Sequence, residues 1–259
     1  MKTTNSAVKT GVAIIAAIAV TMGAKSQSTQ VDDSYFNPDM NSLRNAPADL
    51  VILRPTHFSD SYAKVSHYHE NDSLARTVGR DATLRQAIAE AYDCTPARVI
   101  LPPDAPTDRF DFLVTTPSKV RAHLRKAIEE QLHYTVRRET QNTDVFILKV
   151  SDSALPGMTV SSADESEDIN YKDGKLYFTH QPINAIVGGV SEGLSRPVLD
   201  QTGLTSAYDF SVIWNHDIET RMENGEFNLD GTRKVLAGWG LGLESSNVTM
   251  DMYVVIKTP

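Results

Sequence analysis

The sequence predicts an α+β fold of two related modules, each an antiparallel sheet with two helices packed on it, so that the chain contains an internal repeat. Matched segments around Arg98 and Arg196 lead to this prediction, because each holds a β-like run, a break and a second β-like run. The matched residues keep one constant spacing and pair Arg98 with Arg196, Leu101 with Leu199, Thr107 with Thr205 and Asp111 with Asp209. An apolar pattern of helical period precedes each copy.

The first module is predicted over residues 48–150 and starts with the β-like run at 50–53. Apolar residues recur at helical spacing over 84–91. Thr83 followed by Gln86 predicts a capping box at the start of this helix, because each side chain can bond the other residue's backbone N–H.

The second module is predicted over residues 171–259, with its first helix at 183–194. The glycines of 238–240 are expected to end its last helix, because no strand precedes them as a phosphate-binding loop requires. Residues 151–170 hold five acidic residues and no basic one, which predicts a solvated acidic linker between the modules.

A second helix is expected in each module, over 118–132 and from about 232 to 239. Each of these helices should lead into a pair of strands, at 134–138 and 145–150 in the first module and at 243–246 and 252–256 in the second. Asn142 and Asn247 mark the predicted turns, because asparagine tolerates the left-handed backbone conformation.

The N-terminus is typical of a secretory signal peptide over residues 1–26. Lys2 and Lys9 precede an apolar run at 11–22, and small residues follow at the cleavage positions. This run falls short of the roughly 20 residues of a spanning helix, so we expect cleavage and no stable transmembrane segment afterwards. The protein should therefore be periplasmic or extracellular, with a flexible polar leader at 27–47.

Composition excludes several classes of function. The 259 residues carry a formal charge of −8, which argues against nucleic acid as a partner because phosphate binding needs a basic surface. The single cysteine, Cys94, excludes an internal disulfide and any multi-cysteine metal site. We expect Cys94 to be a buried residue at a helix end, and we expect no cofactor.

Residues 189–193 match G-x-S-x-G, the pattern of a hydrolase nucleophile elbow. Ser191 would be the nucleophile, with Asp209 and His216 following in the required order. The chemistry needs Ser191 on a sharp turn from strand to helix, whereas the apolar pattern places it inside a helix. A helix with small residues packed on a neighbour is therefore the favoured interpretation.

His67 and His69 lie two residues apart, so on a strand both could face one metal ion. Two ligands do not make a site, and a third would have to come from elsewhere in the fold. We favour an exposed polar loop at this place.

The chain resembles a secreted soil-bacterial family of unknown function that carries the domain of unknown function 3738. The resemblance covers about residues 48–258 and is carried by segments 50–55, 79–85, 110–112, 137–140, 144–150, 196–204 and 241–243. It implies no catalytic residues. Related domains are attached to membrane sensor-peptidase or thioredoxin-like modules, so the resemblance implies an extracytoplasmic sensing or binding role.

We therefore expect an exported, non-enzymatic binding or sensing protein whose partner is an envelope protein or a small ligand. A cleft between the modules would be the default site, because ligands favour such junctions. The alternative is an exported hydrolase or metal-dependent enzyme that uses Ser191 or the His67/His69 pair.

Overall fold

Residues 33–37, 40–58, 64–70, 73–116, 119–162, 164, 166–213 and 228–258 are described in a computed structural model of the chain. They belong to one compact unit, Asp32–Pro259, and the other unit is Met1–Val31. The predicted signal peptide and His216 lie outside the described residues. Among the helices of the described ranges, none has the length and apolar character to cross a bilayer.

A first antiparallel sheet has the strand order β1-β5-β3-β2. Its strands are β1 (Val51–Pro55), β2 (Lys64–Glu70), β3 (Ser73–Thr83) and β5 (Arg109–Val114). Helices α2 (Leu84–Tyr92) and α3 (Val120–Leu132) bury their apolar faces against it. Leu84, Ile88 and Leu124 share this core with Phe110 and Phe112 of β5.

A second antiparallel sheet has the order β7-β11-β9-β8. Its strands are β7 (Met158–Val160), β8 (Asp168–Lys172), β9 (Lys175–Pro182) and β11 (Ala207–Ile213). Helices α4 (Ile183–Gly193) and α6 (Leu229–Gly238) belong to its core, in which Ile186 and Leu236 lie with Phe210. The fold is thus mixed α and β with antiparallel sheets, as predicted.

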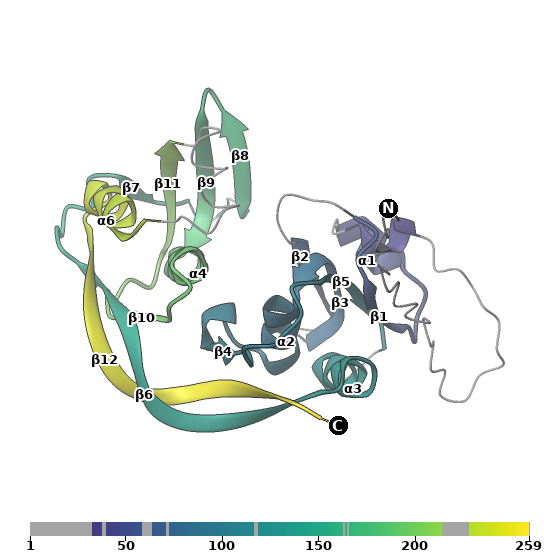
Figure 1. Cartoon of the computed structure of the whole chain (residues 1–259). Helices are drawn as coiled ribbons and strands as arrows, with labels where there is room; N and C mark the ends of the chain where they lie inside the picture. The colour runs from purple at the N-terminus through teal and green to yellow at the C-terminus, as the bar shows by residue number, and fades with distance from the viewer. Residues whose placement is uncertain are drawn as a thin grey trace, which may run out of the picture. The chain divides into compact units, whose positions relative to one another are not determined.

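A third sheet, in the order β10-β6-β12-β4, joins the two halves of the chain (Figure 1). Its long strands β6 (Tyr134–Val150) and β12 (Leu241–Lys257) pair antiparallel over their whole length. The short strand β4 (Val99–Ile100) pairs parallel with β12, whereas β10 (Val198–Asp200) pairs parallel with β6. Each half of the chain therefore adds a strand to the long strand of the other half.

The turns predicted at Asn142 and Asn247 are wrong. Both residues lie in the middle of continuous strands, where Asn142 faces Thr249 and Asn247 faces Asp144. The Thr249 hydroxyl donates to Asn142 Oδ1 at 2.6 Å, and Asn247 Nδ2 donates to Asp144 Oδ1 at 2.8 Å. Cross-strand bonds of this kind stabilise a polar stretch as strand, although its local sequence is typical of a turn.

Several predicted helix boundaries are confirmed. Thr83 and Gln86 form the capping box of α2, and the predicted helix at 183–194 is α4. Helix α6 ends at Gly238, and Gly240 follows with a left-handed φ of +84°. A Cβ on Gly240 would lie 2.9 Å from the Asp152 carbonyl oxygen, so both conformation and space favour glycine there.

Parts of the predicted leader and linker are ordered secondary structure. Within 27–47 lie the 3₁₀ helix η1 (Asp33–Phe36) and α1 (Met40–Asn45), and both Phe36 and Leu43 are completely buried. Arg76 of β3 donates to three carbonyl oxygens of this segment, those of Leu43, Arg44 and Ala46. These residues pack on the first sheet, so flexibility is a wrong expectation for them. Strand β7 and the start of β8 lie within 151–170.

Gly79 of β3 provides a test of packing in the first core. A Cβ at this position would lie 2.1 Å from the ring of Phe112, which is completely buried. Gly79→Ala should therefore lower the free energy of unfolding by about 2 kcal/mol, measured by urea denaturation. Gly188 of α4 is the matched control, because its Cβ would meet nothing within 4 Å. Gly188→Ala should raise that free energy by about 0.5–1 kcal/mol, and equal effects of the two substitutions would contradict the packing.

Candidate functional site

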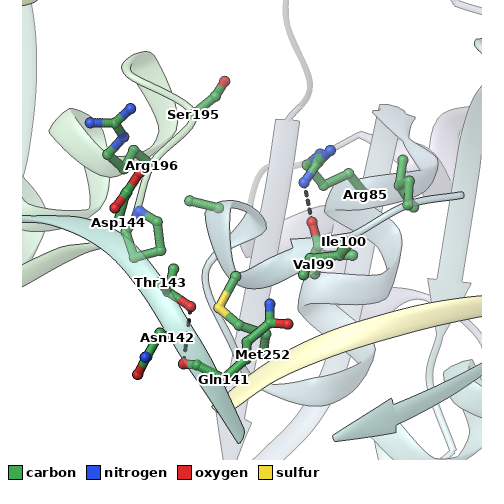
Figure 2. A pocket seen from close by; sticks show the side chains of 13 residues that line it. Arg85, Val99, Ile100, Gln141, Asn142, Thr143, Asp144, Ser195, Arg196 and Met252 are labelled. Atoms are coloured by element: carbon green, nitrogen blue, oxygen red, sulfur yellow. Dashed lines mark hydrogen bonds between the residues drawn. The ribbon is translucent and has the colours of Figure 1, made fainter. Parts of the chain in front are cut away.

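A cleft of about 400 Å³ opens on the central sheet beside the middle of β6 (Figure 2). This volume lies within the range of small-molecule sites in proteins. Its lining comprises Arg85, four residues around β4 (Ala97, Val99, Ile100, Leu101), residues 141–144 of β6, residues 195–197 before β10, and Met252 of β12. Segments from both halves of the chain thus contribute to one hollow.

Arg85 lies in the first turn of α2, where the capping box fixes the start of the helix. Its Nη1 donates to the carbonyl oxygens of Val99 and Pro96, which fastens the 3₁₀ helix η2 (Pro96–Arg98) and β4 to α2. Burial lowers the pKa of the Arg85 guanidinium, because the charged form loses hydration.

Arg196 is part of the cleft lining, in the segment before β10 (Figure 2). Its guanidinium carbon lies 4.9 Å from the centroid of the Phe146 ring on β6, a cation–π distance. The backbone beside it is fixed as well, since the Phe146 N–H donates to the Pro197 carbonyl at 2.9 Å. The Arg196 guanidinium is therefore held over the ring of a residue whose backbone is bonded to the same segment.

The β6 side of the cleft is polar and held in place by bonds within the sheet. Asn142 and Asp144 accept bonds from Thr249 and Asn247 of β12, and the Thr143 hydroxyl donates to the Gln141 carbonyl. Met252 adds an apolar surface and is 4 % exposed. The lining can thus offer hydrogen bonds, positive charge and apolar contact to one ligand.

Ser191 is the ninth residue of α4 and is buried, so the sharp turn of a nucleophile elbow is not formed around it. Its Oγ finds no hydrogen-bond partner within the described residues. Asp209 instead accepts bonds from the Ser161 hydroxyl and the His180 backbone N–H. These bonds lower the pKa of Asp209, the Ser161 bond most. His216 lies outside the described residues.

His67 and His69 lie on β2, and their ring centroids are 6.3 Å apart. His67 Nε2 lies 2.7 Å from Glu90 Oε2, while the Thr77 hydroxyl donates to the other oxygen of Glu90 at 3.2 Å. Across the described ranges, His, Cys, Asp and Glu side chains form no group of three suited to a metal ion. His67 thus joins β2 to α2, a contact that the sequence pattern did not indicate.

Asp111 is a buried carboxylate that accepts several hydrogen bonds. Its position in the repeated segment of the sequence did not indicate this. It is completely buried on β5 and accepts four bonds, from Arg54 Nε, the Thr56 hydroxyl and the backbone N–H groups of His57 and Asp81. A carboxylate so fully bonded ties three strands together. Its role is structural, and it lies outside the cleft lining.

Cys94 follows the last turn of α2, and its backbone N–H donates to the Ala89 carbonyl at 3.0 Å. It packs against the first core and is partly buried, as its predicted place at a helix end requires. Burial raises the pKa of the Cys94 thiol to about 11.

The fold and the cleft define an α+β protein with a mixed polar and apolar hollow on a central sheet. The model of the family described as "protein of unknown function (DUF3738)" matches residues 85–257, a range that includes the whole cleft lining, and the chain belongs to this family. The family predicted from the sequence is thereby confirmed. Comparison with curated proteins and with solved structures gives no match.

Glu90 should make folding stability depend on acid pH. Burial alone would raise its pKa, but the hydrogen bond and charge of His67, the charge of Arg121 and the Thr77 bond lower it below the ordinary 4.5. Ionised Glu90 therefore stabilises the folded chain above about pH 4.5, and this contribution is lost as pH falls through the folded pKa.

Glu90→Gln should thus show a smaller loss of stability than the unchanged chain when urea denaturation is repeated from about pH 6 to about pH 3. Glu130→Gln is the control, because Glu130 is an exposed residue of α3 that pairs with the equally exposed Lys126. If the free energy of unfolding depends on pH identically in Glu90→Gln and in the unchanged chain, the pairing of Glu90 with His67 is contradicted.

Cys94 should react slowly with thiol reagents. Its pKa rises from 9.0 to about 11, so at about pH 8 the thiolate fraction falls about 100-fold. Iodoacetamide labelling followed by mass spectrometry should be slower by about that factor in the folded chain than in the same chain in urea. Equal labelling rates would contradict the burial of the thiol.

Proposed function

We propose that this protein is an exported, non-enzymatic binding or sensing protein of the bacterial cell envelope, and that its ligand or partner occupies the cleft. The cleft itself carries the proposal, because residues from both halves of the chain converge on it. A ligand in contact with Arg85 and Arg196 would bridge the segments that lead into β4 and β10. Binding would thereby stabilise one arrangement of the two halves.

The two halves are, in this proposal, copies of one ancestral module. The sheet orders β1-β5-β3-β2 and β7-β11-β9-β8 support it, since corresponding strands occupy corresponding places. The bonds of two aspartates support it too. Asp111 accepts from the N–H of Asp81, and Asp209 accepts from the N–H of His180. Both donors have a left-handed backbone, with φ of 55° and 53°.

Export is supported by the sequence of residues 1–26, in which basic, apolar and small residues follow the order of a signal peptide. The proposed site is then open to the periplasm or the extracellular space, where envelope fragments and small metabolites occur. The acidic stretch 151–170 contains β7 and the start of β8, so the second proposed module begins within it.

A thermal-shift screen of the purified chain tests the proposal. The panel should hold amino acids, sugars, dicarboxylates and peptidoglycan fragments, and a ligand at about 100 times its Kd should raise the apparent stability by about 2.7 kcal/mol. Thr143→Trp places a large ring in the cleft lining and should abolish the shift. Thr140→Trp, the same change on β6 outside the lining, should retain it.

Two outcomes would contradict the proposal. A ligand that stabilises both tryptophan variants equally binds elsewhere, and a panel without any stabilising ligand removes the support for a binding role. The bound compound should also be recovered unchanged after incubation, because its conversion would indicate an enzyme.

A further inference from the structure

Two arginines hold similar places in the halves of the chain but differ in their bonds. Arg98 lies directly before β4, and its guanidinium carbon is 5.4 Å from the Tyr253 ring of β12. Arg196 lies shortly before β10, 4.9 Å from the Phe146 ring of β6. Each cation thus stacks on an aromatic residue of the long strand that its own segment joins.

In the described part of the chain, only one of the two stacked cations also makes a hydrogen bond to the protein. Arg98 donates from Nε and Nη2 to the Asp251 carbonyl, at 3.1 Å and 2.7 Å. Within the described residues, the Arg196 guanidinium makes no hydrogen bond and no ion pair, and it lines the cleft. Its planar array of N–H donors is therefore available to a ligand, in a geometry that suits a carboxylate or a phosphate.

Arg85 adds a second positive charge at the same hollow. Its guanidinium donates only to carbonyl oxygens in the described part of the chain, those of Val99 and Pro96, so its charge has no counter-ion there. Its guanidinium is also partly desolvated, which lowers its pKa, and an anion nearby would reverse that effect.

The cleft holds one carboxylate, and that group is already bonded. Asp144 Oδ1 accepts from Asn247 Nδ2 at 2.8 Å. Two arginines against this one acid leave the lining with a positive formal balance, although the whole chain carries −8. A positive balance in a cleft raises the local concentration of anions there.

We propose that the cleft binds a small organic anion whose carboxylate or phosphate group bonds to Arg196, with Arg85 as the second cation. The apolar part of the ligand would contact Ile100 and Leu101, which line the same hollow and are partly exposed. This inference rests on the proposed binding function and names the chemical class of its ligand.

Titration of the ¹⁵N-labelled chain tests it, with amide shifts of residues 141–144, Ser195 and Arg196 as the readout. The probes are glutarate, pentanoate, inorganic phosphate, 1,5-pentanediol and 1,5-diaminopentane. The organic anions should shift these amides saturably, and the diol and diamine should not. Tighter binding of pentanoate than of phosphate would indicate a carboxylate site, and the reverse order would indicate a phosphate site.

Arg196→Gln should weaken binding of the best anion at least about 10-fold, because a charge-assisted bond is lost. Arg196→Lys, which keeps the charge, should restore part of that loss. Arg98→Gln is the matched control and should change the affinity less than about twofold, since Arg98 is outside the cleft lining. The amide spectrum of each variant, compared with that of the unchanged chain, reports whether the fold is retained.

Each remaining outcome overturns the inference. Equal weakening by Arg98→Gln and Arg196→Gln, or no anion-dependent shift in the cleft amides, excludes an anion site at Arg196. If the diol or the diamine binds saturably and Thr143→Trp blocks that binding, the cleft is not an anion site. The proposed binding function would still stand in that case. Binding of any probe that Thr143→Trp leaves unchanged would count against the proposed function as well.

Discussion

The full-length pairing of β6 with β12 is the interaction on which the rest of the structure depends. Each of these strands passes through both hydrophobic cores. Tyr134 of β6 and Val255 of β12 lie in the first core, while Phe146 of β6 and Leu241 of β12 lie in the second. Neither core is complete without both strands, and neither β4 nor β10 has a partner without them. The two cores are therefore coupled through the same backbone bonds, which favours their folding as one cooperative unit.

This arrangement also explains why the cleft lies where it does. Between the two cores, β6 and β12 carry polar residues, and pairs such as Asn142 with Thr249 replace apolar packing. Helices cover the apolar ends of the β6–β12 pair, and β4 and β10 each pair with only a short part of these long strands. A hollow remains beside the middle of β6, with Arg85 and Arg196 in its walls.

Structural features that depend on neighbouring residues along the chain could be predicted from the sequence. Features that depend on residues distant in the chain could not. Helix α4 and the capping box of Thr83 follow from local periodicity and local bonds, so both could be predicted. The stretch around Asn142 has a local preference for a turn, and only β12, about a hundred residues away, makes it a strand. The same limit applies to the cleft. The sequence pattern did not indicate Arg196 as a site residue, because its contact with Phe146, and its lack of the bond that Arg98 makes, follow from the fold.

The polar groups that suggested chemistry in the sequence are mostly used within the fold. His67 is bonded to Glu90, Asp209 accepts from Ser161 and His180, and Asp111 accepts from four donors. A group whose bonding capacity is filled by the protein has little left for a ligand, whereas unsatisfied donors beside a hollow can bind one. Arg196 meets this criterion and is anchored next to β10, which pairs with β6. An anion held there would contact the strand junction that couples the two cores, so ligand binding and the mutual arrangement of the halves would be linked by the same residues.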